Sequence, residues 1–258
     1  MEKHFELTDE TIEVAGNTMH RIRCTRDCKW AKTGDLGGFI EKEDNLSGNA
    51  WVADNARVYG DARVYGDARV YGNARLAGNA QVSDNARVYG NAWLSDNAWV
   101  YGDARVYGNA WVSGDAWVSG DARLAGKAWV SDNARVYGNA WLSDNAQVYG
   151  NARVSDNAWV YGDARVSDNA WVYGDARLAG KARVAGNDDH CGFDVFGSIG
   201  RHTHAYRTSD GGVEITCGCF HGDIEAFEAK VRHTHGDSQY AREYLAIAHV
   251  IRVKFGLA

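Results

Sequence analysis

The chain has 258 residues, a formal net charge of −6, 30 glycines and no proline. The length allows one large domain or two smaller ones; abundant glycine without proline disfavours a disordered chain, and the negative charge disfavours a nucleic-acid-binding protein of the basic-patch type. No stretch approaches the ~18 apolar residues of a membrane span, the opening residues MEKHFELTDE lack the apolar core of a signal peptide, and five cysteines without disulfide-framework spacing suit a reducing cytoplasm.

Residues 1–45 differ in composition from the repeats that follow, and we predict that they form a β-hairpin cap. The segment TIEVAGNTMHRIRCT is typical of a hairpin, with residues 15–17 at the turn. The segment KTGDLGGFIEKEDNLS then leads into the repeats. We expect Phe39 and Ile40 to cover the first apolar layer of the next domain.

Residues 46–189 repeat with a period of six. Alanine recurs every six residues from Ala50 to Ala182, 23 times without a break, and Val or Leu stands two residues after each one. These two residues share one side of a short strand, and the residue between them points to the other side. The residues that follow, such as YGD, SDN or AGN, form turns, because Gly, Asp and Asn accept positive φ. The repeat predicts a parallel β-helix with three hexads, or 18 residues, per coil and about eight coils.

The hexad resembles the hexapeptide repeat of left-handed parallel β-helices: an aliphatic residue, a turn with Gly or Asp, and a small residue at the fifth place. The left hand is implied by this resemblance, because periodicity alone does not give it. A slip of one hexad would preserve every inward contact, so the repeats by themselves specify register weakly. Open ends would also expose strand edges. We therefore expect the two flanking segments to cap the helix and to set its register.

The outward positions hold twelve Arg, nine Trp and two Gln. Residues 18 apart should form ranks on three faces, with steps of about 4.8 Å, and the arginines should stack on rings or pair with Asp residues at the corners. Such planar groups favour a partner, self-association or a planar ligand; the alternative is a solvated strand face, where aromatic residues are common. The candidate binding residues are Trp93, Trp111 and Trp129 in one rank, Trp99 and Trp117 in a second, and Arg69, Arg87, Arg105 and Arg123 in the third.

Residues 190–258 are predicted to form a small α+β domain, a β-hairpin followed by two helices. THAYRT and VEITCGCF flank SDGG, which indicates a hairpin with a glycine turn. Asp223 is placed to cap a first helix that ends at Gly236, and a second helix should start at Asp237. The apolar face of the second helix could cap the coil, pack on the hairpin or contact another subunit, and we expect capping together with an oligomer contact. The candidate contact residues are Tyr240, Tyr244, Ile247, Ile251 and Phe255.

Histidine and cysteine are concentrated in this last segment. If residues 210–211 centre the hairpin, His204 lies opposite Cys217 and His202 lies opposite Cys219, with all four on one sheet face. Two imidazoles and two thiolates are zinc-compatible ligands, although four ligands from two adjacent strands fit a tetrahedron poorly. The alternative interpretation is buried cysteines that act as small apolar residues beside surface histidines. No other cofactor is expected.

The segments GDLGGFIEKEDNLSGNAWVADNARVYGDARV, AYRTSDGGVEITCGCFHGDIEAFEAKV and THGDSQYAREYLAI resemble a family of hexapeptide-repeat proteins from bacteriophages, prophages and enteric bacteria. The resemblance covers nearly the whole chain. It implies a β-helix fold and a phage origin, and hence action in the cytoplasm of a host cell. It supplies no catalytic residues, and the transferase labels that some relatives carry rest on analogy of fold.

Three hypotheses for function follow. The first is a non-enzymatic, oligomeric binding or scaffold protein, a dimer or trimer, that engages a host protein such as a defence factor, or a small planar nucleotide-like ligand, through its Arg, Trp and Tyr surfaces. The second is an acyl- or nucleotide-sugar transferase, which is disfavoured because the hexads contain no insertion and no histidine. The third is a structural component of a virion.

Overall fold

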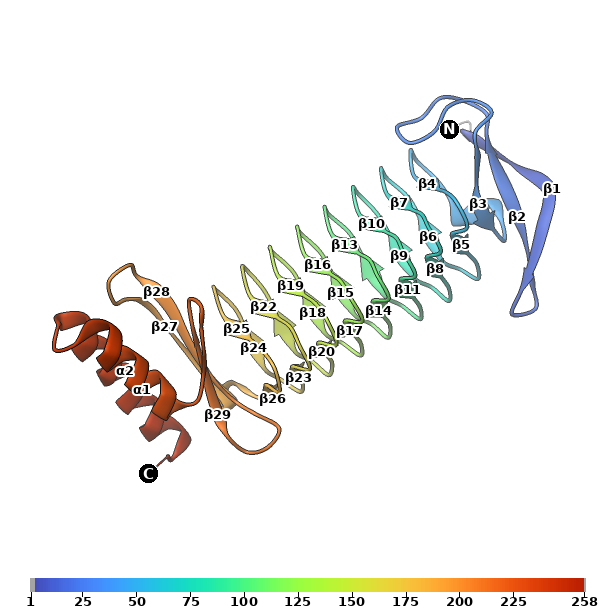
Figure 1. Ribbon diagram of the computed structural model, residues 1–258. Helices are drawn as coiled ribbons and strands as arrows, with labels where there is room; N and C mark the ends of the chain where they lie inside the picture. Colours follow the sequence, from blue (N-terminus) through green and yellow to red (C-terminus); the bar gives the residue numbers. More distant parts are fainter. Residues whose placement is uncertain (1–2, 258) are drawn as a thin grey trace.

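The computed structural model describes residues 3–257 and divides the chain into a cap, a solenoid and a second cap (Figure 1). The two termini lie at opposite ends of the molecule (Figure 1). The first cap contains β1 (Phe5–Val14), β2 (Asn17–Cys24), β3 (Leu36–Ile40) and the short 3-10 helix η1 (Glu43–Asn45). Residues 1 and 2 of the predicted first cap and residue 258 of the predicted last domain lie outside the described residues.

The first cap is the predicted hairpin extended by one strand. β1 and β2 pair antiparallel with Val14 opposite Asn17, which places the turn at Ala15 and Gly16. β3 pairs antiparallel with β2 and parallel with β5, and so joins the cap to the solenoid. Ile40 is fully buried in the solenoid core, as expected, but Phe39 points outward, with the guanidinium carbon of Arg21 4.3 Å from its ring.

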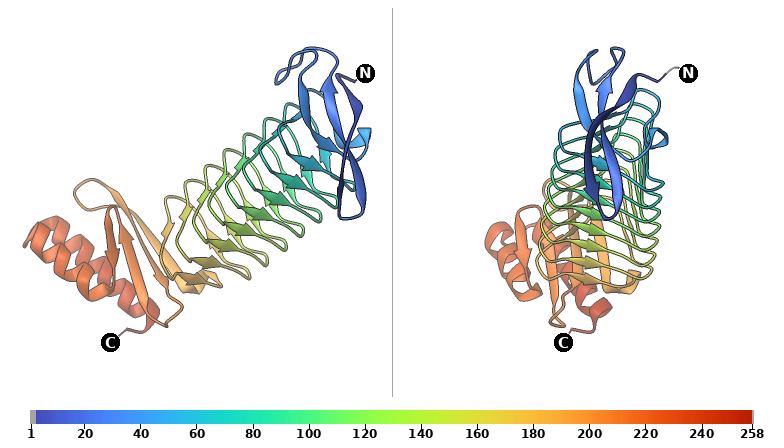
Figure 2. Two further views of the ribbon diagram at one scale, coloured as in Figure 1. Left: turned by 45° about the vertical axis from the view of Figure 1, so that its right-hand side comes forward. Right: turned by 90° about the vertical axis from the view of Figure 1, so that its right-hand side faces the viewer.

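The repeats form two-residue strands, each paired in parallel with the strand 18 residues further along the chain. Three sheets result, as the period predicts (Figure 2). The 11-stranded sheet continues from β3 with β5 (Arg57–Val58), β8 (Arg75–Leu76), β11 (Trp93–Leu94), β14 (Trp111–Val112), β17 (Trp129–Val130), β20 (Gln147–Val148), β23 (Arg165–Val166) and β26 (Arg183–Val184).

The other two sheets belong wholly to the solenoid. The 8-stranded sheet consists of β4 (Trp51–Val52), β7 (Arg69–Val70), β10 (Arg87–Val88), β13 (Arg105–Val106), β16 (Arg123–Leu124), β19 (Trp141–Leu142), β22 (Trp159–Val160) and β25 (Arg177–Leu178). The 7-stranded sheet consists of β6 (Arg63–Val64), β9 (Gln81–Val82), β12 (Trp99–Val100), β15 (Trp117–Val118), β18 (Arg135–Val136), β21 (Arg153–Val154) and β24 (Trp171–Val172). With the isolated bridge between Leu46 and Val64, the solenoid has about eight coils.

The solenoid core consists of the inward Ala, Val and Leu of every hexad, all of them fully or almost fully buried. The corners take positive φ at Gly or Asp. At six of the seven corner Asp residues, all except Asp168, the carboxylate accepts the backbone N–H of the Gly one coil further on. Six such bonds of 2.9–3.2 Å join Asp54, Asp84, Asp96, Asp132, Asp144 and Asp156 to Gly72, Gly102, Gly114, Gly150, Gly162 and Gly174, respectively.

The C-terminal domain is a four-stranded antiparallel sheet covered by two helices. The sheet, reached through the 3-10 helix η2 (Asn187–Asp189), has the order β27 (His190–Phe196), β28 (Arg201–Arg207), β29 (Val213–Cys217) and β30 (Phe220–Gly222). The predicted hairpin is β28–β29, whereas β27 and β30 were not predicted. The helices are α1 (Ile224–His235), capped by Asp223 as expected, and α2 (Gln239–Phe255), capped by Ser238 rather than Asp237.

This sheet separates two environments. One face packs on α1 and α2, and the other closes the end of the solenoid, where Tyr206 joins the solenoid core (Figures 1 and 2). Backbone and side-chain bonds fix the junction: the Ser209 N–H donates to Lys181, and the Thr216 hydroxyl donates to the carbonyl of Arg177. Neither helix has the length and hydrophobicity needed to cross a membrane.

Candidate functional site

The first outward rank stacks its three tryptophans into a ladder. The ring centroids of Trp93 and Trp111 are 5.3 Å apart at an interplanar angle of 10°, and those of Trp111 and Trp129 are 6.0 Å apart at 28°. Each of the three side chains is about two-fifths exposed, at 37%, 43% and 41%. We call Trp93, Trp111 and Trp129 the indole ladder; its geometry is the one that the 18-residue spacing predicts.

The second rank does not stack. Trp99 and Trp117 meet edge to face, with centroids 5.7 Å apart at 78°. Trp99 packs on Tyr101, whereas Trp117 lies under the guanidinium group of Arg135, 4.7 Å from its ring. A shallow cavity of about 260 Å³ borders this group and is lined by Tyr101, Trp117, Ser119, Arg135, Tyr137 and Arg153. The two indoles are therefore engaged by neighbours within their own face.

The third rank places four arginines in register on consecutive strands, as predicted. We call Arg69, Arg87, Arg105 and Arg123 the arginine rank. At the adjoining corner the rings of Tyr71, Tyr89 and Tyr107 stack, with centroids 4.8 and 5.0 Å apart and nearly parallel planes.

Of the two expected arrangements of the outward arginines, stacking occurs for Arg69, Arg135 and Arg177, whereas pairing with corner Asp residues does not occur. None of the twelve outward arginines of the solenoid forms an ion pair with any residue between 3 and 257. The reason is that corner carboxylates lie at the bend and accept backbone N–H groups of the next coil instead. The arginine rank therefore carries charge that no carboxylate of the described chain neutralises at contact distance.

A ring of the first cap contacts half of the arginine rank, although Arg87 stays exposed to solvent. The loop between β2 and β3 carries Trp30, whose ring centroid lies 5.5 Å from the guanidinium carbon of Arg69 and 5.4 Å from that of Arg87. The indole N–H donates to the carbonyl of Asp67 at 2.8 Å, and Lys29 forms an ion pair with the same residue. The sequence did not predict the contact of Trp30 with Arg69 and Arg87. The signal available was that Trp30 is the one tryptophan of ten outside the outward positions.

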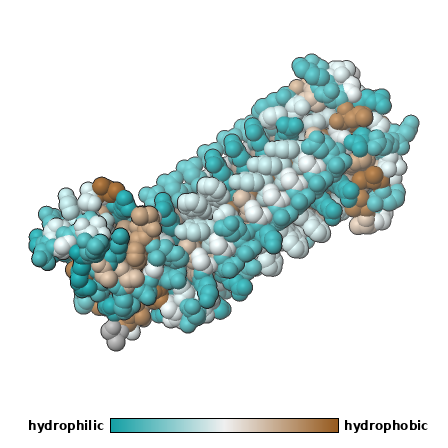
Figure 3. Space-filling view, in the orientation of Figure 1, coloured by the Kyte–Doolittle hydropathy of each residue, from teal (hydrophilic) through white to brown (hydrophobic). Residues whose placement is uncertain are grey.

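The uncovered half of the rank repeats the same chemistry. Arg105 and Arg123 follow Arg87 in register, and Tyr107 continues the tyrosine stack beside them. No ring of the described part of the chain covers either guanidinium group. Figure 3 shows that the solenoid surface in view is hydrophilic to intermediate, whereas strongly hydrophobic residues gather at the two ends.

Four of the five residues predicted as an oligomer contact are buried inside the domain. Tyr244, Ile247, Ile251 and Phe255 are at most 6% exposed and pack between α2, α1 and the sheet. Only Tyr240 remains open to solvent. The prediction failed because the sequence revealed two strands, while the four strands present are wide enough to cover the apolar faces of both helices.

The predicted zinc ligands do not share a face. β28 and β29 pair Thr203 with Cys217 and His204 with Thr216, one residue away from the expected register. Because successive side chains alternate, this shift turns Cys217 toward the helices, where the Thr203 hydroxyl donates to its sulfur, while His202 and His204 face the solenoid. Cys219 lies beyond the strand and is exposed. Within residues 3–257, no group of three or more His, Cys, Asp or Glu has a metal-binding arrangement.

The histidines form a chain instead. His190 Nδ1 lies 3.1 Å from His204 Nε2, and His204 Nδ1 lies 3.3 Å from His202 Nε2. The other nitrogen of His202 bonds to Asp194, so a carboxylate accepts from one end of the chain. Burial lowers the pKa of His204 well below the usual value of 6.5, and burial also lowers the pKa of His190. His190 and His204 are therefore neutral near pH 7, and the histidine chain adds polar groups to the end of the solenoid beside Tyr206.

Comparison with known families supports the solenoid. The YdcK beta solenoid repeat matches residues 56–68, 80–96, 98–114, 104–120, 128–144, 146–162 and 158–174. All of these segments lie within the predicted repeat region and together cover less than half of the chain. No curated protein matches the chain. The similarity thus concerns the coil, and it carries no information about the two caps or about a phage origin.

Proposed function

We propose that the protein is a non-enzymatic binding scaffold that holds aromatic side chains of a partner protein on the arginine rank. The observation that supports this most is the position of Trp30, because the chain itself seats an indole on Arg69 and Arg87. A guanidinium group without an ion pair attracts the face of an aromatic ring, and more strongly once water is excluded. Trp30 thus serves as an internal example of the partner group.

The binding surface of this scaffold is Arg105, Arg123 and Tyr107. Arg105 and Arg123 follow Arg69 and Arg87 in the same register. They therefore offer a second indole an equivalent pair of cations, with Tyr107 beside them. Aromatic residues and arginine are also the types most enriched where binding energy concentrates in protein interfaces. The free charge favours a partner segment that combines aromatic with acidic side chains.

The solenoid suits this role because it is rigid and its surface is continuous. Between β4 and β26 every connection spans four residues, and each strand within a sheet, apart from those at its ends, bonds to both neighbouring coils. The indole ladder lies on another sheet and offers an apolar surface of three stacked rings. A partner that wraps the coil would use both surfaces, and a partner that binds one face would use the arginine rank alone.

The test is capture of partners from cells by three forms of the full chain, read by quantitative mass spectrometry. The forms are the wild type, the double variant R105Q/R123Q and the double variant R165Q/R183Q. The control pair is also exposed, is also 18 residues apart and removes the same charge from a different sheet. A true partner is retained by the wild type and the control and is reduced at least tenfold with R105Q/R123Q. If no retained protein distinguishes the two double variants, the proposed surface is wrong.

A further inference from the structure

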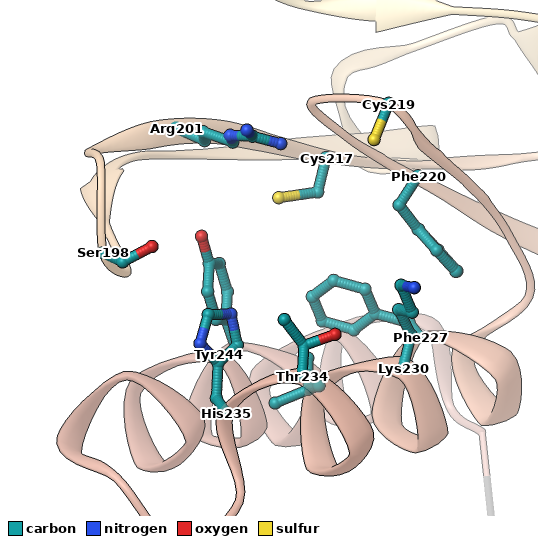
Figure 4. Close-up of a pocket in the computed structure, with 11 residues that line it drawn as sticks. Ser198, Arg201, Cys217, Cys219, Phe220, Phe227, Lys230, Thr234, His235 and Tyr244 are labelled. Carbon is teal, nitrogen blue, oxygen red and sulfur yellow. The ribbon is translucent and has the colours of Figure 1, made fainter.

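A cavity of about 260 Å³ opens between the sheet and the helices of the C-terminal domain (Figure 4). Figure 4 shows Arg201, Cys217, Cys219 and Phe220 from the sheet side facing Tyr244, His235, Thr234, Phe227 and Lys230 from the helix side. Ser198 and Val231 complete the lining. A dry cavity of about 150 Å³ holds a benzene ring, so this one has room for a ring with a substituent.

The lining is cationic although the chain as a whole is acidic. Arg201 and Lys230 border the cavity, and no aspartate or glutamate lines it. Neither of these two side chains forms a hydrogen bond or an ion pair with any described residue. In a protein of net charge −6, two unneutralised cations at one concave site attract a negatively charged ligand.

Two glycines make room for the polar groups at one end of the cavity. A Cβ at Gly218 would lie 2.1 Å from Nη1 of Arg201, and a Cβ at Gly197 would lie 2.0 Å from the hydroxyl of Tyr244. Both glycines have positive φ, so their backbone conformation also excludes most other residues. The Gly197 N–H is in turn held by the carboxylate of Glu243 at 2.8 Å. The positions of the guanidinium and the phenol therefore depend on two backbone sites that accept no side chain.

The remaining groups divide the cavity into a polar end and an apolar end. The hydroxyls of Tyr244 and Ser198 lie on the same side as Arg201 (Figure 4). Burial, together with the neighbouring Cys217 thiol, raises the pKa of Tyr244 to about 12, which keeps its proton available for donation. The other end is formed by the rings of Phe220 and Phe227, whose centroids are 5.4 Å apart, with the ammonium group of Lys230 beside them (Figure 4). The two ends together suit a molecule with an anionic head and a flat apolar body.

We propose that this cavity binds a small aromatic anion, with its carboxylate or phosphate on Arg201 and the hydroxyl of Tyr244 and its ring against Phe220 and Phe227. Lys230 at the rim raises the local concentration of the anion and adds a weaker attraction. The inference is independent of the binding scaffold, because it uses no residue of the solenoid. It assigns the C-terminal domain a ligand-binding role in addition to closing the coil.

The test uses fluorine NMR on the full chain with three probes of one shape: 4-fluorobenzoate, 4-fluorophenyl phosphate and the neutral 4-fluorobenzyl alcohol. We expect the wild type to bind at least one anion with a dissociation constant below a few millimolar, and the alcohol at least tenfold more weakly. Whichever anion binds more tightly identifies the head group as carboxylate or phosphate. Inorganic phosphate should compete only weakly, because it lacks the ring.

Two variants, R201Q and K230Q, each remove one cation of the cavity. R183Q is the control, because it removes one exposed arginine outside the cavity. R201Q should weaken binding of the better anion at least tenfold, since it removes the charged hydrogen bonds to the head, and K230Q should weaken it about threefold. R183Q should bind within twofold of the wild type, and unchanged thermal unfolding of all three would confirm that they fold. The proposal is overturned if the folded wild type binds neither anion at 10 mM, if the alcohol binds as well as the anions, or if R201Q binds them within twofold.

Discussion

At the scale of single residues, the corners carry the tightest constraint in the solenoid. Gly120 has φ of +65°, and a Cβ there would lie 2.9 Å from the carbonyl oxygen of Gly138 in the next coil. Gly174 has the same positive φ, but nothing lies within 4 Å of its missing Cβ. Gly186 has neither constraint, because its φ is extended and the space around it is open. The three positions therefore separate backbone strain from collision with the neighbouring coil.

Alanine at these three glycines should destabilise the protein in a graded order. G120A combines the strain of a left-handed Ala with a backbone collision and should raise the free energy of the folded state by about 2–4 kcal/mol. G174A carries the strain alone, about 1 kcal/mol, and G186A should be within about 0.5 kcal/mol of the wild type. Thermal unfolding followed by circular dichroism measures the order. Equal midpoints for G120A and G186A would contradict the account of the corners.

At the scale of elements, the corners also contribute to register, which the inward residues alone do not specify. Every corner Asp has a Gly 18 residues later, and in six of the seven cases the N–H of that Gly donates to the carboxylate. Pairing strands 12 residues apart would instead place Asp132 beside Asp144, and pairing them 24 apart would place Asp132 beside Asp156. Adjacent carboxylates about 4.8 Å apart repel, so slipped registers are disfavoured within the coil and not only at its ends.

The burial of His204 in the sheet of the C-terminal domain should make the stability of the protein depend on pH. Burial holds the pKa of His204 well below 6.5 in the folded protein, while the unfolded chain keeps the usual value. As pH falls below about 6.5, His204 binds a proton in the unfolded state but not in the folded state. The free energy of unfolding therefore decreases by up to about 1.4 kcal/mol per pH unit. Above that pH the group contributes no slope. The pKa of the neighbouring His190 is lowered as well, by burial and by the charge of Lys254, while the charge of Asp189 acts in the opposite direction.

Unfolding midpoints between pH 7.5 and 5.5 would measure this dependence in the wild type and in H204Q. The variant removes the titrating ring and keeps a polar side chain beside His190 and His202, so its stability should fall less steeply below pH 6.5. H233Q is the control, because His233 is an exposed residue of α1 with no bonded partner in the described chain. Parallel curves for wild type and H204Q would contradict the assignment of the slope to the buried imidazole.

At the scale of the whole molecule, eight coils separate two caps that end the solenoid in different ways. The first cap continues the coil through β3 and seats Trp30 on the arginine rank. The second cap meets the last coil through Tyr206, Thr216 and the histidine chain. Because each coil contacts only its neighbours, a change at one cap should alter the local stability of a few adjacent coils and leave the far end of the molecule unaffected.

Replacement of Trp30 by alanine tests this separation. W30A loses the indole contacts with Arg69 and Arg87 and the bond to Asp67, so the loop between β2 and β3 should open more readily. Hydrogen exchange read by mass spectrometry should be at least tenfold faster in residues 25–35 and unchanged in residues 190–257. Unchanged exchange in the loop would show that the indole contacts do not hold it.

The sequence by itself determined the coil, because the coil depends on residues that are close together in the chain and on a pattern that repeats. A period of six with Ala and Val or Leu inside fixes the strands, the three faces and the ranks of outward residues, and the indole ladder follows from spacing alone. The repeat matches confirm this level of the prediction. The apolar pattern of α1 and the position of the β28–β29 hairpin were likewise readable from neighbouring residues.

Only the tertiary structure decided the contacts between segments far apart in the chain. A shift of one residue in the hairpin moved Cys217 and His204 to opposite faces, and no local signal specifies that register. The two extra strands buried Tyr244 and its neighbours on α2, and the same packing formed the cavity with Arg201. Trp30 reached the arginine rank through a loop whose path depends on the coil beneath it. Such contacts arise from the docking of whole elements, and a pattern of residue types along the chain does not contain them.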